Sequence, residues 1–396
     1  MLVAFLKGAL VAALSTLGGL VAAEIALRIL APDILRPPAE KGFFEYKTDG
    51  RALGLVPNYA GNQTRKEFST VLRTNDIGLR DHRSLAEIVR APGLRIMCMG
   101  DSFTFGWGVD WEQTWCQRLG QYLRNERQID TTTVSTGYDN GLSPVQYAFS
   151  LDNYLSRLKP DLVIASLFME NDVKEAGYIE ADGTKGQRLR ELSLGDGYLV
   201  TEAGAQRGKL YLFAYQASYL VRLVARAATM ISTTILQSNG ATIEVSNDKT
   251  PYFFLSGVPK PDDASYAATL AALVRMRDTL AGKGIRFLVM VIPSNFQVSA
   301  HYFGPMAENF GFSPATLATV MASGQPQAFL ADYFARNGIE FVDLLPAFRQ
   351  IDRPGNRLYF DIDAHFSVKG NDEAARQIAE ALARKGFLGR PGQPRN

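Results

Sequence analysis

The sequence of 396 residues is poor in cysteine and carries almost no net charge. Its two cysteines, Cys98 and Cys116, are too few for a disulfide framework. The two cysteines could form one disulfide. Because Cys98 lies in an apolar run, however, we expect it to be a buried thiol. Lysine and arginine number 42 against 40 aspartates and glutamates, a formal net charge of +2. This balance gives no signal for nucleic acid or for an acidic partner.

Histidine is also scarce, and neither an internal repeat nor a low-complexity tract is visible. The only candidates for an imidazole base are His82, His301 and His365. The length is sufficient for one large α/β domain with additions or for two ordinary domains.

The first thirty residues differ in kind from the rest of the chain. Residues 1–30 are almost wholly apolar apart from Lys7, Glu24 and Arg28, and the uncharged residues 8–23 together with 1–6 are long enough to reach the roughly 20 residues that span a bilayer. A cleaved signal peptide is the alternative, since small residues at 21–23 offer a cleavage site, and a buried core helix is a further one. We favour an uncleaved transmembrane anchor, because the apolar helical pattern continues past residue 23.

Prolines then end the helix, and residues 31–93 are expected to form a linker and a small β-rich lead-in that packs beside the main domain. From residue 94, short apolar runs alternate with amphipathic segments. Strands are expected at 95–99, 132–136, 161–168, 285–292 and 339–344, and helices at 113–125, 144–158, 262–282, 314–337 and 370–385. This alternation is typical of a doubly wound parallel sheet, whose ligands bind at the carboxyl ends of the strands.

A long insertion, residues 173–261, separates the third and fourth strands. Its apolar part, residues 211–236, contains Arg222 and Arg226, which are costly in hydrocarbon. We therefore expect a cap helix over the crevice, or a helix on a membrane surface, rather than a second span.

Candidate catalytic residues follow the strands in turn. Gly100-Asp101-Ser102 ends the first strand and offers a hydroxyl nucleophile. Gly137 and Gly141 follow the second strand, and Asn171 follows the third; a main-chain N–H and an amide at these places can stabilise an oxyanion. Taken one at a time, each is equally compatible with an ordinary turn.

Asp363-Ala364-His365 follows the last strand. In an extended segment, side chains two residues apart point to the same side, so Asp363 is expected to orient His365 while the other ring nitrogen takes the proton of Ser102. Asp361 lies on the same face and stays open as the orienting carboxylate. A metal cluster of Asp101, Asp361, Asp363 and His365 is the competing interpretation of the same residues.

In this order, the motifs resemble those of the SGNH (GDSL-like) hydrolase superfamily. The resemblance covers residues 94–387 without the insertion, although Phe103 replaces the leucine of the GDSL pattern and Met169 replaces a glycine. It implies a flavodoxin-like three-layer α/β/α fold with a parallel five-stranded sheet over residues 94–396. It also implies Ser102, Asp363 and His365 as the catalytic triad, with Ser102, Gly141 and Asn171 as oxyanion donors and neither a cofactor nor a metal.

Residues 74–81 are similar to a segment of membrane-anchored bacterial members of this superfamily. The resemblance thus implies a single-pass inner-membrane protein with its catalytic domain in the periplasm. We expect a serine esterase or deacetylase that removes O-acyl groups, O-acetyl above all, from an envelope glycan or a small ester, without a nucleic-acid partner. The alternatives are an O-acetyltransferase of a surface polysaccharide and a catalytically silent glycan-binding or assembly protein.

Overall fold

The computed structural model describes residues 2–30, 44–45, 54–137, 143–169, 172, 218–221, 223–224, 264–304, 318, 321–322 and 324–389. The chain divides into two compact units, Met1–Lys41 with Arg190–Ser246, and Gly42–Leu189 with Asn247–Asn396. We refer to them as the smaller and the larger unit. Nearly all of the predicted insertion, including most of the helix expected at 211–236, lies outside the described residues.

The smaller unit contains the expected N-terminal helix, α1 (Leu2–Leu30). Near its end, the Glu24 carboxylate accepts hydrogen bonds from the Ser218 hydroxyl and from the main-chain N–H groups of Tyr219 and Leu220, at 2.7 to 3.0 Å. Burial opposes ionisation of this carboxyl, but these bonds and that from Arg28 lower the pKa of Glu24 to about 2. In the part of the chain that the structure describes, no helix is long and apolar enough to cross a membrane, so the predicted transmembrane span is not supported.

The larger unit is built on a parallel five-stranded sheet in the order β6-β5-β7-β8-β9. The strands are β5 (Leu94–Met99), β6 (Thr131–Ser135), β7 (Leu162–Phe168), β8 (Arg286–Ile292) and β9 (Phe341–Asp343). All five predicted strands are confirmed, and the order is that of a flavodoxin-like fold. Because β5 lies between the second and third strands of the chain, strand order reverses at β5, and folds of this kind bind ligands at the carboxyl ends of the strands there.

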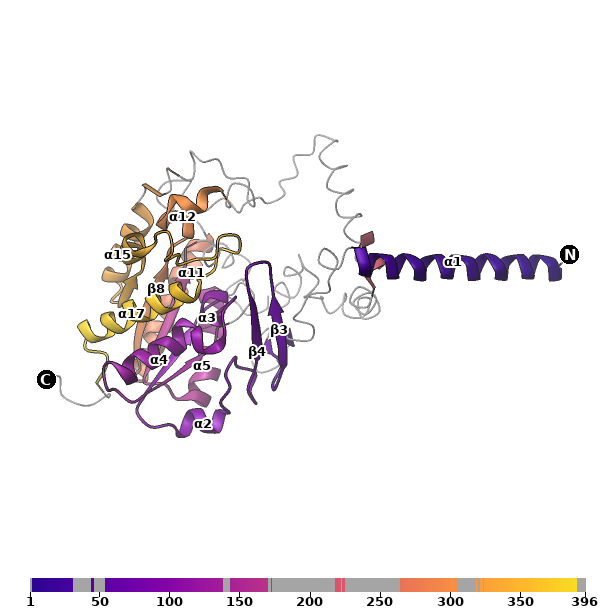
Figure 1. The fold of residues 1–396 in the computed structure, drawn as a ribbon. Helices are drawn as coiled ribbons and strands as arrows, with labels where there is room; N and C mark the ends of the chain where they lie inside the picture. The colour runs from indigo at the N-terminus through magenta and orange to yellow at the C-terminus, as the bar shows by residue number, and fades with distance from the viewer. Residues whose placement is uncertain are drawn as a thin grey trace. The chain divides into compact units, whose positions relative to one another are not determined.

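Helices cover both faces of this sheet (Figure 1). On one face, Ile96 and Cys98 pack with α4 (Trp115–Asn125), α16 (Leu345–Ile351) and α17 (Val368–Arg384). On the other, Met97 and Met99 pack with α5 (Pro144–Leu158), α11 (Ala264–Gly282) and α15 (Gln325–Arg336). Successive residues of a strand point to opposite faces, which is why β5 is apolar throughout. Within the helix expected at 314–337, α15 accounts for Gln325–Arg336; the described residues 318 and 321–322 are also helical, Gly324 is not, and residues 314–317, 319–320 and 323 lie outside the described ones.

Local sequence signals fix where these helices begin. Thr114 accepts a hydrogen bond from the N–H of Gln117 at the start of α4, and Ser367 accepts one from the N–H of Gly370 at the start of α17. Pro144 occupies the first position of α5, where a missing N–H has no consequence.

Cys98 and Cys116 form a disulfide between β5 and α4. The expectation of a buried thiol at Cys98 is therefore wrong. Both residues are fully buried in the same core cluster, with their Cα atoms 6.2 Å apart. Sequence spacing could not reveal this, because the pairing depends on which face of β5 the helix α4 covers.

The segment before β5 contains four short strands. It contains β1 (Phe44–Glu45), β2 (Gly54–Leu55), β3 (Ala60–Thr64) and β4 (Ser69–Arg73), paired as two antiparallel hairpins, followed by α2 (Leu85–Arg90). Figure 1 shows the hairpin of β3 and β4 beside α3 (Ser102–Phe105).

Arg80 ties this lead-in to the loop after α3. The side chain is only 2% exposed and donates to the main-chain carbonyls of Phe105, Gly106 and Val109, at 2.9, 2.6 and 2.6 Å. Burying a guanidinium is costly, and the three bonds from its two terminal nitrogens to main-chain oxygens offset part of this cost.

Candidate active site

Ser102 occupies the first position of α3, directly after β5. Asp101 caps this short helix by accepting the N–H of Phe103 at 3.0 Å. At Gly100 a Cβ would lie 2.0 Å from Thr104 Oγ1 and 2.1 Å from Ser166 Oγ, so only glycine fits where the strand passes into the helix. The tight turn places the serine hydroxyl at the carboxyl end of β5.

Ser102, His365 and Asp363 form one hydrogen-bonded chain. Ser102 Oγ lies 2.8 Å from His365 Nε2, although the two residues are 263 positions apart in the sequence. His365 Nδ1 lies 2.5 Å from Asp363 Oδ1. A carboxylate at Nδ1 fixes the tautomer in which Nε2 accepts the serine proton. The predicted triad is thus brought together in the geometry that activates a serine nucleophile.

Asp361 does not take part in this chain. Its carboxylate contacts His301 instead, with Oδ1 2.7 Å from His301 Nε2. Between the two aspartates left open by the sequence, the geometry selects Asp363 as the residue that orients His365.

The backbone from Asp361 to His365 forms a turn, and the expectation of an extended segment is wrong. Ala364 has a φ of +68°, in the left-handed region that alanine adopts at a cost of about 1 kcal/mol. The turn is closed by a hydrogen bond of 2.9 Å from the N–H of Phe360 to the carbonyl of His365. Asp363 and His365 therefore meet because of this turn and not because of strand alternation.

Trp107 holds the second oxygen of Asp363. Its indole Nε1–H donates to Asp363 Oδ2 at 2.9 Å. Burial raises the pKa of this carboxyl, but the hydrogen bonds from His365 and Trp107 and the charges of His365 and Arg65 outweigh it, so the pKa lies below its ordinary value of 3.8. Asp363 is consequently ionised wherever His365 acts as a base.

Of the predicted oxyanion donors, the structure describes only Ser102. Its N–H belongs to the first turn of α3, where helical N–H groups have no acceptor within the helix. Gly141 and Asn171 lie outside the described residues. The N–H of Gly137, the alternative to Gly141, donates to Ser135 Oγ at 3.2 Å and is engaged there.

Asp172 anchors the chain next to Asn171. It is fully buried, and its carboxylate accepts the N–H of Phe168 at 2.7 Å and the Tyr147 hydroxyl at 3.4 Å. The bond to Phe168 joins Asp172 to the last residue of β7.

The residues of the competing metal cluster are engaged in other contacts. Asp101 caps α3, Asp361 contacts His301, and only Asp363 and His365 adjoin one another. Over the described ranges, no group of three or more histidine, cysteine, aspartate or glutamate side chains is arranged to hold a metal ion.

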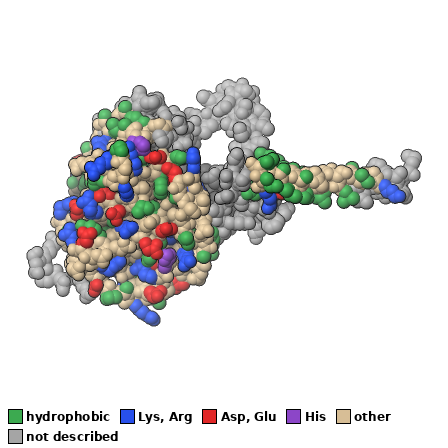
Figure 2. Space-filling model, viewed as in Figure 1, with side chains coloured by type: hydrophobic (Ala, Val, Ile, Leu, Met, Phe, Trp, Pro, Cys, Tyr) green, Lys and Arg blue, Asp and Glu red, His purple; other side chains and the backbone are tan. Residues whose placement is uncertain are grey.

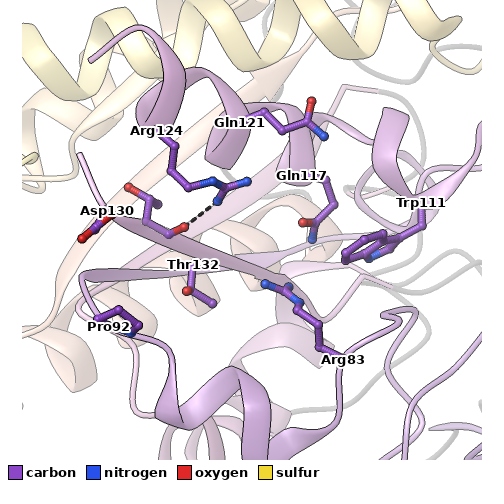
Figure 3. Close-up of a pocket in the computed structure, with 9 residues that line it drawn as sticks. Arg83, Pro92, Trp111, Gln117, Gln121, Arg124, Asp130 and Thr132 are labelled. Atoms are coloured by element: carbon purple, nitrogen blue, oxygen red, sulfur yellow. Dashed lines mark hydrogen bonds between the residues drawn. The ribbon is translucent and has the colours of Figure 1, made fainter. Parts of the chain in front are cut away.

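A pocket of about 350 Å³ lies at the start of β6, and no triad residue lines it (Figure 3). Arg124 donates to the carbonyl of Thr131 at 2.6 Å, and Arg83 contacts Asp81 and the carbonyl of Thr133, both at 2.7 Å. Burial and the neighbouring Arg83 lower the pKa of Arg124. Because both guanidinium groups already have partners, this pocket gives no argument for a ligand. Over the face of the described larger unit seen in Figure 2, acidic and basic side chains are interspersed.

Sequence reasoning missed several residues that contact the triad. Trp107 could have been noticed, because it lies in the aromatic loop after the nucleophile. The sequence gives no indication of the roles of Glu67 and Arg65. Nothing in an isolated Arg-Lys-Glu-Phe segment predicts contact with the turn at Asp361, which lies 294 residues later.

Part of the chain matches a known family model. Residues 253–395 match the family model described as "SGNH hydrolase-like domain, acetyltransferase AlgX". No curated protein matches the chain.

Among solved structures, a lipolytic protein of the G-D-S-L family from Desulfitobacterium hafniense is 12% identical and covers 73% of this chain and 99% of its own, with a TM-score of 0.35. The esterase EstA from Pseudoalteromonas is 11% identical and covers 74% and 98%, with a TM-score of 0.36. A lipase/acylhydrolase from Enterococcus faecalis is 11% identical and covers 76% and 100%, also with a TM-score of 0.36.

The Ser102, His365 and Asp363 geometry is that of an activated serine nucleophile, and residues 253–395 are similar to the SGNH hydrolase-like domain of the family model.

Proposed function

We propose that this protein is a serine esterase that removes O-acyl groups, O-acetyl above all, from an envelope glycan or a related small ester. The observation that carries the proposal is the continuous hydrogen-bonded chain from Ser102 through His365 to Asp363. A binding protein has no need of such a chain, whereas acyl transfer through a serine depends on it.

In this mechanism, Ser102 Oγ attacks the ester carbonyl carbon while His365 Nε2 takes the hydroxyl proton. Asp363 stabilises the resulting imidazolium and holds its orientation. His365 then donates the proton to the departing alkoxide oxygen, so that the free alcohol leaves and the acyl group remains on Ser102 Oγ as an acyl-serine. Water attacks this acyl-enzyme in the same way, with His365 first accepting its proton and then returning one to Ser102 Oγ.

An O-acetyltransferase of a surface polysaccharide is the second candidate, and the description of the matching family model favours it. The order of the motifs along the chain supports hydrolysis. In the alginate-acetylating members of the superfamily that this sequence resembles, the Asp-x-His motif precedes the serine, whereas here Ser102 precedes His365. The two reactions share the acyl-enzyme and differ only in the acceptor that reaches it.

The first test is turnover of a short-chain aryl ester by the full-length chain. Ser102→Ala should lower kcat by at least about 10³-fold, since the nucleophile is lost. A fluorophosphonate probe should label the wild-type protein at Ser102 and leave the variant unlabelled. Wild-type turnover in Ser102→Ala would refute the assignment, and an unlabelled wild type would favour the silent binding protein.

The second test distinguishes the acceptors. With an aryl acetate donor and an oligosaccharide that carries no acetyl groups, we expect acetate to appear as fast as the phenol and the oligosaccharide mass to stay unchanged. Acetylated oligosaccharide formed in place of acetate would support the transferase.

We also propose that the domain works in an oxidising, extracytoplasmic compartment. The Cys98–Cys116 disulfide supports this location, because structural disulfides persist where thiols are not kept reduced.

A further inference from the structure

The turn between β3 and β4 reaches the acid residue of the triad. Glu67 Oε1 accepts the main-chain N–H of Asp361 at 2.8 Å, and Oε2 accepts those of Ile362 and Asp363, at 3.0 and 2.8 Å. One carboxylate therefore binds three successive N–H groups of the turn that carries Asp363.

These bonds fall on a backbone that carries strain. Ala364 follows directly in the left-handed region, which is unfavourable for alanine. Hydrogen bonds from neutral donors to a charged acceptor are stronger than those between neutral groups, so the three to Glu67 offset this strain.

Two aromatic contacts at the same hairpin tip support the turn and its neighbour. The Phe68 ring lies 5.2 Å from Phe360 and 6.1 Å from Trp107, and the Arg65 guanidinium lies 5.0 Å from the Trp107 ring. At Gly108, a Cβ would lie 2.5 Å from Phe360 and 3.0 Å from Phe68. The hairpin tip thus touches both the backbone of Asp363 and the indole that donates to its carboxylate.

We propose that Glu67 is a positioning residue for catalysis: it clamps the turn 361–364 and so keeps the Asp363 carboxylate on His365. The hairpin that precedes the nucleophile in the chain is then part of the catalytic machinery. This inference rests on the proposed function, because it concerns the same triad.

Glu67→Gln is the main test. A glutamine has one acceptor oxygen and places an NH2 group against N–H donors, so it cannot hold all three. We expect kcat for a short-chain aryl ester to fall about 10- to 100-fold, since small misplacements in an active site have effects of this size, with KM within about twofold. Glu67→Asp keeps the charge on a shorter side chain and should restore part of kcat.

Glu87→Gln is the matched control. Glu87 also accepts a main-chain N–H, that of Ser84 at 2.7 Å, but it does so in the capping box of α2. We expect this variant to keep wild-type kcat. Equal losses of kcat in Glu67→Gln and Glu87→Gln would overturn the positioning role.

A double variant separates positioning from general destabilisation. If Glu67 acts through Asp363, Glu67→Gln should lower kcat at most about twofold once Asp363→Asn is present, because coupled residues are non-additive. The same 10- to 100-fold loss in both backgrounds would overturn the inference, as would unchanged kcat in Glu67→Gln.

A measurement without turnover distinguishes this failure from that of the proposed function. The proton shared by His365 Nδ1 and Asp363 Oδ1 should give a far-downfield 1H resonance in the wild type that is lost or broadened in Glu67→Gln and kept in Glu87→Gln. An unchanged resonance in Glu67→Gln overturns the clamp, whatever the substrate is. If the resonance is lost in Glu67→Gln but a fluorophosphonate does not label the wild type, the positioning role of Glu67 stands and the proposed function alone is overturned.

Discussion

Two aspartates separated by one residue have different partners in this protein. Asp361 contacts His301 and is half-exposed, whereas Asp363 contacts His365 and Trp107 and is largely enclosed. Chemical type is identical at the two positions, so the difference in role comes entirely from the turn that Glu67 and Ala364 shape. Variants of Asp361 and Asp363 can therefore be compared to test which carboxylate orients His365.

Asp363→Asn should lower kcat about 10³- to 10⁴-fold, because an amide stabilises the wrong histidine tautomer and does not stabilise the imidazolium. Asp361→Asn, which alters the His301 contact only, should stay within about threefold of the wild type. The measurement is kcat for an aryl ester at pH 7.5. Similar losses in the two variants would reverse the assignment of the orienting carboxylate.

At the scale of elements, a carboxyl between β9 and α16 has a raised pKa. Asp343 ends β9 and accepts the N–H of Leu345 at 3.0 Å. Burial raises its pKa to about 6, although this hydrogen bond and the charge of Arg349 oppose the rise. Its ordinary value is 3.8, so the folded state binds the proton more tightly than the unfolded state. This contribution to stability is complete below pH 3.8 and is lost as the pH rises through 6.

Asp343→Asn should therefore stabilise the protein at pH 7.5 by about 1 to 3 kcal/mol, because asparagine keeps an acceptor oxygen for Leu345 and has no charge to bury. Near pH 4 the gain should almost vanish. Tm measured by circular dichroism at both pH values provides the check. Asp332→Asn, at an exposed position on α15, is the control and should change Tm little at either pH. Equal gains for Asp343→Asn at both pH values would contradict this account.

At the scale of the whole molecule, the disulfide joins the inner strand β5 to the covering helix α4. It closes a loop with a sequence separation of 18, for which chain entropy predicts about 3 kcal/mol of stabilisation. Reduction of the wild type should lower Tm, whereas the double variant Cys98→Ala/Cys116→Ala should have the same Tm with and without reductant. If both cysteines of the denatured, unreduced protein react with an alkylating agent, the disulfide is not formed.

Most of the sheet could be predicted from the sequence, because apolar runs such as 162–168 have only one reasonable place in an α/β fold. The triad residues Ser102, Asp363 and His365 could also be predicted, since each follows a strand of the same sheet. Contacts made through the main chain could not. The bonds of Glu67 and Arg80 depend on backbone atoms that every residue has, so no side-chain pattern indicates them. The shape of the turn at Ala364 was missed for the same reason.

Arg80 has a consequence for the shortest fragment that could work as an enzyme. A fragment beginning at Leu94 would include every triad residue, and yet it would lack the guanidinium that occupies the space under residues 105–109. Three carbonyls would lose their donor, and buried acceptors without donors are costly. Recombinant truncations and gene fusions should therefore be cut before Ala60, so that the hairpin and Arg80 stay with the serine.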